Sequence, residues 1–318
     1  MKNKILIVMT FLAGTLLFNS CLKDKLNSDW TSSLAGKMYA EIPNNNKQAT
    51  TITPDPTDQD IKFLVNIATD ALPTTDMTIT VAIDPAGIAK FNADPVLNTT
   101  GTQYVLYPTA TIVNPVVTIK AGTRNNYVHV TLKSANLLNL STAWMLPITI
   151  TAVSSGATIA DNKKTVYIAL PIANKWEGKY KMLTGSSFSD LLNPSFYLNF
   201  PDNYALETAG PYSVNVKDLG TSSAGGYARL VWSAPGAGTY YGSFCAVYTI
   251  DPVTNKVTVV TNYYGQPASN GRSAALDPAG VNTYNPATKT FDVSYFCEAP
   301  GTTVRLKFHD ILTWTGTL

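Results

Sequence analysis

From residue 37 onward, apolar and polar residues alternate in short runs. The alternation is clear in residues 77–83, 128–133 and 146–151, and each run is bounded by Pro, Gly, Asn or Asp. Successive side chains of a strand point to opposite faces of a sheet, so this pattern predicts half-buried strands joined by turns. The chain is therefore expected to be all-β, with a short helical segment at residues 85–92 as the exception.

The predicted strands form two blocks. The first block closes with a strand at residues 165–170 and ends at Pro171. The second has predicted strands at residues 195–200, 228–232, 244–250, 257–261, 290–297 and 304–309. A chain of 318 residues is long enough for two domains with separate hydrophobic cores. We therefore predict two β-sandwich-like domains, at residues 37–171 and 172–318.

The N-terminus has the order of an exported lipoprotein. A basic start precedes a largely apolar run at residues 5–18, and Cys21 follows after a small residue. This order predicts a signal peptide at residues 1–20, acyl chains such as palmitate on Cys21, and a polar tether at residues 21–36. Two alternatives remain. In the first, the apolar run is an uncleaved membrane anchor, although it is shorter than the roughly 20 residues that a spanning helix needs. In the second, the signal is cut at another position and Cys21 is not lipidated.

The polar residues carry little charge. Asp, Glu, Lys and Arg make up 14% of the chain, and the net charge of +2 matches the contribution of Lys2 and Lys4 in the predicted signal peptide. A near-neutral exported chain has no electrostatic footprint for nucleic acid or anionic lipid. Membrane contact is therefore expected through the lipid anchor only. Hydroxyl and amide side chains fill the polar positions, and they suit neutral ligands such as sugars.

Short motifs in both blocks resemble those of Bacteroidetes surface lipoproteins. They lie at residues 61–65, 104–108, 119–122 and 146–150, and then at residues 176–180, 276–280, 285–291 and 314–316. Their order resembles an immunoglobulin-like N-terminal domain, formerly of unknown function, followed by its commonly paired C-terminal β domain. The resemblance covers nearly all of the predicted mature chain. It implies that the first sandwich is immunoglobulin-like.

The same resemblance implies a place and partners. Such lipoproteins belong to polysaccharide-utilisation systems, on the outer membrane, beside a glycan importer and its glycan-capturing lipoprotein. Only Asp24 matches the acid-rich tag that often marks surface display. The expected location is therefore the cell surface, with the periplasmic face as the alternative. The resemblance assigns no binding residues.

No catalytic or metal-binding motif is evident. A glycosidase needs two carboxylates across a cleft, but the acidic residues are scattered and are expected to be solvated loop acids and turn caps. They include Asp190, Asp202, Glu207, Asp218, Asp251 and Glu298. The two histidines are far apart in sequence, so they predict neither a metal site nor a catalytic pair. We therefore predict a protein that is not an enzyme and needs no metal or cofactor.

Cys245 and Cys297 lie in predicted strands. Export permits a disulfide between them, and two reduced core cysteines are the alternative. Sequence does not fix the geometry that a disulfide needs, so both possibilities stay open.

Aromatic residues are the best ligand-binding candidates, because the C–H faces of sugars stack on aromatic rings. Trp232, Tyr240 and Tyr241 flank a glycine-containing loop, and Tyr263 and Tyr264 follow a predicted strand. Adjacent strand residues point in opposite directions, so one tyrosine of each pair should be exposed. We predict that these five residues form a weak binding platform. The alternative is that most of them are core or sheet-face aromatics.

These features predict a non-catalytic cell-surface lipoprotein that captures a glycan for a neighbouring outer-membrane importer. The alternative is a structural or adhesive surface subunit that binds a protein partner, which an open sheet edge or an apolar patch would favour. A third possibility is a hydrolase, which two facing carboxylates in a cleft would favour.

Overall fold

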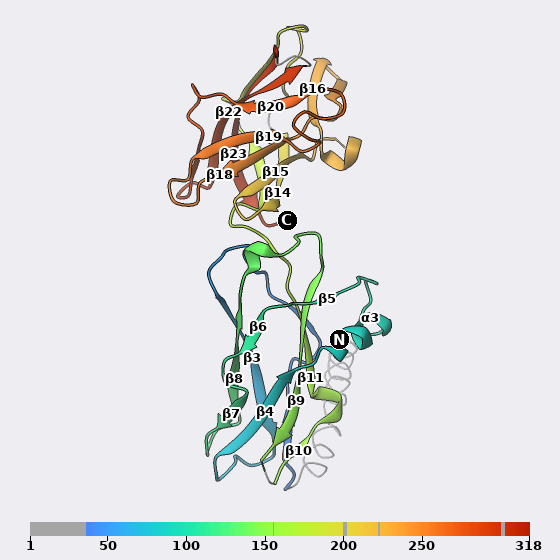
Figure 1. The fold of residues 1–318 in the computed structure, drawn as a ribbon, viewed down its shortest axis with the longest axis vertical. Coiled ribbons are helices and arrows are strands. Elements are labelled where there is room, and N and C mark those ends of the chain that lie inside the picture. Colours follow the sequence, from blue (N-terminus) through green and yellow to red (C-terminus); the bar gives the residue numbers. More distant parts are fainter. Residues whose placement is uncertain (1–35, 155, 200–201, 222, 300–302) are drawn as a thin grey trace, which may run out of the picture.

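The computed structural model describes residues 36–154, 156–199, 202–221, 223–299 and 303–318 (Figure 1). The predicted signal peptide, Cys21 and most of the predicted tether lie outside these ranges. The described chain is nearly all β, which confirms the predicted fold class. Within these ranges, no helix is long and apolar enough to cross a membrane.

The first body is a sandwich of two sheets. One sheet has the order β10-β1-β3-β8-β6, and the other has the order β2-β11-β9-β4-β7 with β5 beside β9. The strands are β1 (Tyr39–Glu41), β2 (Lys47–Ala49), β3 (Gln59–Ala68), β4 (Met77–Ile83), β5 (Val105–Leu106), β6 (Ala110–Ile112), β7 (Val116–Ile119), β8 (Asn125–Leu132), β9 (Trp144–Val153), β10 (Thr158–Ile159) and β11 (Thr165–Ala169). Alternating apolar residues such as Phe63, Ile79 and Val130 meet between the sheets.

Short helical segments complete the first body. Helix α3 (Ala86–Ala93) lies against β9, and its Phe91 packs with Tyr167 in a small separate cluster. Two 3-10 turns, η1 (Ala135–Leu137) and η2 (Asp161–Lys163), connect strands. The helix agrees with the helical segment expected at residues 85–92.

The second body is one strongly curved sheet of ten strands. Its main order is β19-β18-β15-β14-β12-β23-β22-β20, with β13 beside β23 and β21 beside β22. The strands are β12 (Gly178–Met182), β13 (Ser187–Asp190), β14 (Asp202–Gly210), β15 (Ser213–Asp218), β18 (Ala246–Ile250), β19 (Val257–Asn262), β20 (Ser273–Leu276), β21 (Thr283–Asn285), β22 (Thr290–Ala299) and β23 (Thr303–Gly316). A bridge between Lys256 and Thr283 brings the two ends together, so the sheet is nearly a barrel.

A hairpin lies apart from this sheet. Strands β16 (Arg229–Ala234) and β17 (Ala237–Tyr241) pair only with each other as a regular two-stranded sheet, after the short turn η3 (Ser223–Gly226). The first residue of the hairpin, Arg229, is 4% exposed, and Val231 is fully buried in the core of the second body. The hairpin therefore packs one of its faces against the near-barrel.

The two bodies stack end to end (Figure 1). Their cores share no residue: the first draws on residues between Ala40 and Leu170, and the second on residues between Trp176 and Leu312. Where they meet, the Ala173 N–H donates to the Ile52 carbonyl oxygen at 3.0 Å. The division into domains at residues 37–171 and 172–318 stays a prediction.

Candidate functional site

The outer face of the β16–β17 hairpin carries exposed aromatic residues. Gly236 has a φ of +76°, a left-handed conformation that glycine adopts without strain in a tight turn. In the antiparallel register, Trp232 pairs with Gly238 and Leu230 pairs with Tyr240, so all four residues face the same side. Tyr240 is 46% exposed, whereas Trp232 is half-buried.

Tyr197 extends this surface on the other side of β16. Its backbone N–H donates to the Trp232 carbonyl oxygen at 3.0 Å, and the Trp232 N–H donates back at 2.9 Å. Bridged residues point to the same side, so Tyr197, which is 37% exposed, lies beside the indole. We call Tyr197, Leu230, Trp232 and Tyr240 the hairpin face.

Gly238 shapes the hairpin face. Two carbons of the Trp232 ring lie 3.5 Å from the position that a Cβ of Gly238 would take. The indole ring therefore lies over the backbone of Gly238, at ordinary van der Waals distance from where a side chain would begin.

Tyr241 points the other way, into the core, so its predicted place in an exposed platform is wrong. It is 5% exposed, and its hydroxyl donates to the Asp190 carboxylate at 2.5 Å. Arg305 also reaches Asp190, at 3.4 Å. Asp190 is 1% exposed, so it is not a solvated acid, but it is a turn cap, the other expected role: its Oδ1 accepts from the Leu192 and Asn193 N–H groups at 2.8 and 3.1 Å. The strand alternation that exposes Tyr240 buries its neighbour.

Tyr263 and Tyr264 form a tyrosine cluster with Tyr227. Tyr263, which is 45% exposed, stacks on Tyr227 with 4.4 Å between ring centroids and 5° between planes. The Tyr264 hydroxyl donates to the Tyr227 carbonyl oxygen at 2.7 Å. Burial raises the pKa of Tyr264, and the neighbouring Cys245 and Tyr263 add to the rise. The ring stacking and the hydrogen bond therefore join the three tyrosines into one cluster.

An ion pair braces the tyrosine cluster. Lys217 Nζ lies 2.9 Å from the Glu207 carboxylate and 5.0 Å from the centre of the Tyr227 ring. The Tyr227 hydroxyl donates to the same carboxylate. Burial and this hydrogen bond raise the pKa of Tyr227, so the phenol remains a donor at neutral pH.

Tyr197 and Tyr227 were not among the site residues predicted from the sequence. Tyr197 lies in the predicted strand at residues 195–200, and Tyr227 follows a glycine-rich stretch that looks like a plain flexible loop. Each residue becomes part of the surface through a partner far along the chain, Trp232 for one and Tyr263 for the other. Aromatic composition was the only local signal that could have marked them.

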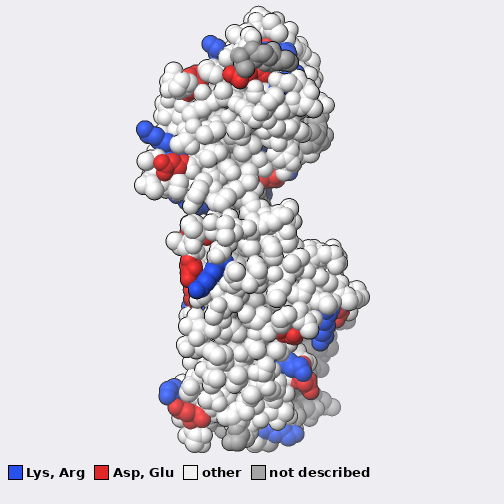
Figure 2. Space-filling model, viewed as in Figure 1, with Lys and Arg blue, Asp and Glu red and all other residues white. Residues whose placement is uncertain are grey.

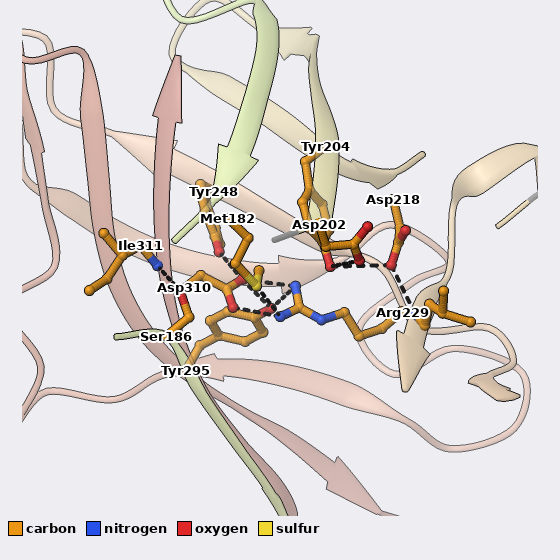
Figure 3. Close-up of polar contacts among 11 residues, drawn as sticks. Met182, Ser186, Asp202, Tyr204, Asp218, Arg229, Tyr248, Tyr295, Asp310 and Ile311 are labelled. Atoms are coloured by element: carbon orange, nitrogen blue, oxygen red, sulfur yellow. Dashed lines mark hydrogen bonds and ion pairs between the residues drawn. The ribbon is translucent and has the colours of Figure 1, made fainter. Parts of the chain in front are cut away.

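Arg229 fixes the base of the hairpin inside the near-barrel (Figure 3). Its guanidinium makes a bidentate pair with Asp310, with N–O distances of 2.6 and 3.0 Å. The rings of Tyr204 and Phe308 lie 5.2 and 4.9 Å from the guanidinium carbon. Both charged groups are buried, and a buried pair is tolerated only when its hydrogen bonds are well satisfied.

Two tyrosines complete the polar shell of Asp310. The hydroxyls of Tyr248 and Tyr295 each donate to Asp310 Oδ2 at 2.9 Å. Burial raises the pKa of both phenols, and the Asp310 charge adds to the rise for each. Burial alone would lower the pKa of Arg229, but Asp310 and the tyrosines outweigh it, so the guanidinium stays charged.

Asp218 ties β15 to the start of the hairpin. It accepts hydrogen bonds from the Leu230 N–H at 2.9 Å, the Gly220 N–H at 2.8 Å and the Tyr204 hydroxyl at 3.2 Å. Asp202 lies 3.4 Å from the same hydroxyl, and burial is the main cause that raises the pKa of both carboxyls. Asp218 is fully buried and therefore not a solvated acid, but the bond from Gly220 makes it a turn cap, the other expected role. The bonds that Asp218 accepts give it a structural role.

Cys245 and Cys297 are free and buried, so the structure holds the reduced alternative and not the disulfide. The Cys245 thiol points at the Val216 carbonyl oxygen, 3.2 Å away. Burial raises the pKa of each thiol to about 12. Such thiols stay protonated at neutral pH and are poor nucleophiles.

The molecular surface carries few charges. On the face that Figure 2 shows, basic and acidic residues occur as small scattered groups. Across the described ranges, no three His, Cys, Asp or Glu side chains are arranged to hold a metal ion. The hairpin face therefore offers a ligand an exposed aromatic surface.

Comparisons with known proteins agree with the fold. A family model described as "-like, N-terminal domain" matches residues 34–157. A search of curated protein sequences finds no match. A Bacteroides ovatus protein of unknown function is 11% identical, with 88% of this chain and 95% of that chain covered and a TM-score of 0.58. This likeness shows that the all-β, two-body architecture occurs in a second protein.

Two further structures share less of the geometry. An auxiliary nutrient binding protein from Bacteroides thetaiotaomicron is 13% identical over 83% of this chain and 90% of that chain, with a TM-score of 0.36. EndoBT-3987 from the same species, bound to a Man5GlcNAc product, is 21% identical over 42% of this chain and 31% of that chain, with a TM-score of 0.34. Neither likeness is close enough to carry an argument about function.

Replacing Arg229 by Met should destabilise the protein strongly. The change leaves Asp310 charged and buried without its partner, which costs about 3–5 kcal/mol. The double variant Arg229→Met/Asp310→Leu should recover part of this loss, because it removes the unpaired charge. The free energy of unfolding, measured in urea, checks both expectations. The control is Lys120→Met, which breaks the exposed pair of Lys120 and Asp76 and should cost at most about 1 kcal/mol. Equal losses in the single and double variants would contradict the role of the charge pair.

Replacing Asp190 by Asn should cost stability only where the aspartate is ionised. Burial alone would raise its pKa, but hydrogen bonds from Tyr241, Leu192 and Asn193 hold it at about 2, below the ordinary 3.8. A depressed folded-state pKa stabilises the protein above about pH 4, and the effect is lost as the pH falls through about 2. Asp190→Asn should be less stable by about 2 kcal/mol at pH 7. The difference in unfolding free energy between wild type and variant, measured in urea at decreasing pH, should narrow below pH 4. A difference that stays constant would contradict the stabilising role of the ionised Asp190.

Proposed function

We propose that this protein captures neutral glycans on the hairpin face and does not cleave them. The observation that carries the proposal is the row of Tyr197, Trp232 and Tyr240, which lie side by side and partly exposed on one face of an anchored hairpin. Aromatic rings are large, stiff contact surfaces, so they bind with little loss of conformational freedom.

The four residues of the hairpin face are uncharged, which supports a neutral ligand. Leu230 and Gly238 separate the aromatic residues, and the ion pair between Lys217 and Glu207 is satisfied internally. Affinity should be modest, between micromolar and millimolar, or about −8 to −4 kcal/mol. Capture of a long polymer tolerates such affinity because several copies on one membrane engage it together.

Location and partners belong to the same proposal. The N-terminal order of basic, apolar and small residues before Cys21 supports a lipid anchor on the outer membrane, at the cell surface or on its periplasmic face. A captured glycan would then pass to a neighbouring importer and its capture lipoprotein. The first sandwich would hold the second body away from the lipid surface.

A structural or adhesive role is the second candidate, and one observation favours it. In the described residues, β17 pairs only with β16, so its other edge is free to add a strand from a partner protein. The same variants separate the two roles, because β-strand addition uses backbone groups and is insensitive to the side chain of Trp232.

Trp232→Ala and Tyr240→Ala should weaken glycan binding. A glycan-array screen of residues 22–318, followed by calorimetric titration of the hits, should give saturable binding to one neutral glycan class without product release. Each substitution should lower the affinity about tenfold, because truncation of a central aromatic anchor costs about 1–2 kcal/mol. Tyr127→Ala, which removes an exposed tyrosine of the first body, is the matched control and should bind as the wild type does. A blank array with folded protein would reject glycan capture.

Cys21→Ala should release the protein from the membrane. In cells grown with labelled palmitate, the wild-type chain should carry label and sediment with the outer membrane, because acyl chains supply the anchoring energy. The variant should carry no label. Cys245→Ala is the control, since its thiol is buried and not reactive. Labelled Cys21→Ala protein would contradict the assignment.

A further inference from the structure

A hollow lies on the outer side of the curved sheet. It has a volume of about 520 Å³ and lies over β14, β15, β18 and β19. Leu140 and Ser141 of the first body contribute to its lining, and the remaining lining residues belong to the second body. We call it the outer concavity. Its volume falls within the range of about 300–1,000 Å³ that is typical of small-molecule sites.

The floor of the outer concavity is a row of residues across three strands. Asn215 on β15 pairs with Val247 on β18, which pairs with Thr261 on β19. The alternate residues of these strands, such as Val214 and Tyr248, are buried in the core, so the row points outward. The floor therefore has an aliphatic centre between an amide and a hydroxyl.

The polar groups of the floor are not used by the protein. Asn215 is 9% exposed, yet within the described chain its amide has no hydrogen-bond partner. The hydroxyls of Ser213 and Thr261 also lack partners in the described ranges. The amide is therefore open to water, and it offers two donors and one acceptor to a ligand in the hollow.

Tyr263 provides an aromatic wall. One side of its ring is covered by Tyr227, which Glu207 and Lys217 hold in place, and 45% of the residue remains exposed. None of the lining residues is charged. The site therefore combines apolar surface with side chains that can hydrogen-bond to hydroxyl groups, and it has no charged side chain to pair with an ionic ligand.

We infer that the outer concavity binds one neutral sugar residue, an inference that rests on the proposed capture of glycans. The C–H face of the sugar packs on Tyr263 and Val247, and its hydroxyls bond Ser213, Asn215 and Thr261. The site is distinct from the hairpin face, where rings stack on an open surface. Because Ser141 contributes to the rim, the first body takes part in recognition and is more than a spacer.

The test uses small sugars that are too short to need the hairpin face. Residues 22–318 with ¹⁵N label are titrated with methyl β-D-glucopyranoside, methyl α-D-mannopyranoside and methyl β-D-galactopyranoside, with D-glucuronate as the charged comparison. At least one neutral methyl glycoside should bind saturably and shift the side-chain amide signals of Asn215. Glucuronate should bind more weakly. The loss of one hydrogen bond in Asn215→Leu or Thr261→Val should lower the affinity about fivefold.

Matched controls separate this site from the hairpin face. Thr258→Val changes an exposed threonine of the same strand outside the hollow, and it should bind as the wild type does. The position of the shifted signals, at Asn215 and not along residues 229–241, separates this site from the hairpin face. Thermal unfolding confirms that each variant is folded.

The outcomes are distinguishable. If polysaccharide binds through Trp232 but no methyl glycoside binds, or if one binds equally well to Asn215→Leu, the outer concavity is not a sugar site although glycan capture stands. If neither polysaccharide nor methyl glycoside binds to folded wild-type protein, the proposed function itself fails. Binding that is lost in Asn215→Leu, retained in Thr258→Val and accompanied by shifts at Asn215 supports the inference.

Discussion

The ion pair between Arg229 and Asp310 is the interaction on which the second body depends. A guanidinium and a carboxylate lie inside a nearly closed sheet, where the loss of water around each charge is expensive. Their bidentate contact, the two tyrosine hydroxyls on Asp310 and the aromatic rings around Arg229 offset that cost. Because Arg229 is the first residue of β16, this pair also sets where the hairpin leaves the barrel.

The binding surface follows from that anchor. Once Arg229 points inward, the alternation of a strand sends Val231 into the core and Leu230 and Trp232 to the outside. On the paired strand β17, Tyr241 lies opposite Arg229 and points inward, whereas Tyr240 lies opposite Leu230 and points outward. The exposed aromatic residues are therefore the outward half of a hairpin whose inward half is held by buried polar contacts. Packing beneath the hairpin therefore supports an aromatic face that is exposed to water.

Much of the fold could be predicted from the sequence, because local alternation specifies strands. The run at residues 77–83 coincides with β4, and the short helix was expected within one residue of its observed ends. The site was predictable in part: Trp232, Tyr240 and Tyr263 are exposed or half-exposed as the platform required.

What could not be predicted depends on pairs far apart in sequence. The buried state of Asp190 requires Tyr241, 51 residues later, and the exposed position of Tyr197 beside Trp232 requires a single bridge. Arg229 looks like an ordinary polar strand residue until Asp310, 81 residues away, is placed opposite it. The sequence pattern specifies strands but not which charged residues will share a barrel interior.

Hydrogen–deuterium exchange of the wild type and of Asp310→Asn tests the central claim most directly. If the buried pair holds the hairpin face, backbone amides of residues 229–241 should lose protection in the variant, because an unpaired anchor opens locally. Amides of β3 and β8 in the first sandwich should exchange as in the wild type. Unchanged protection across the hairpin would show that the aromatic face is held by other contacts and would contradict the account.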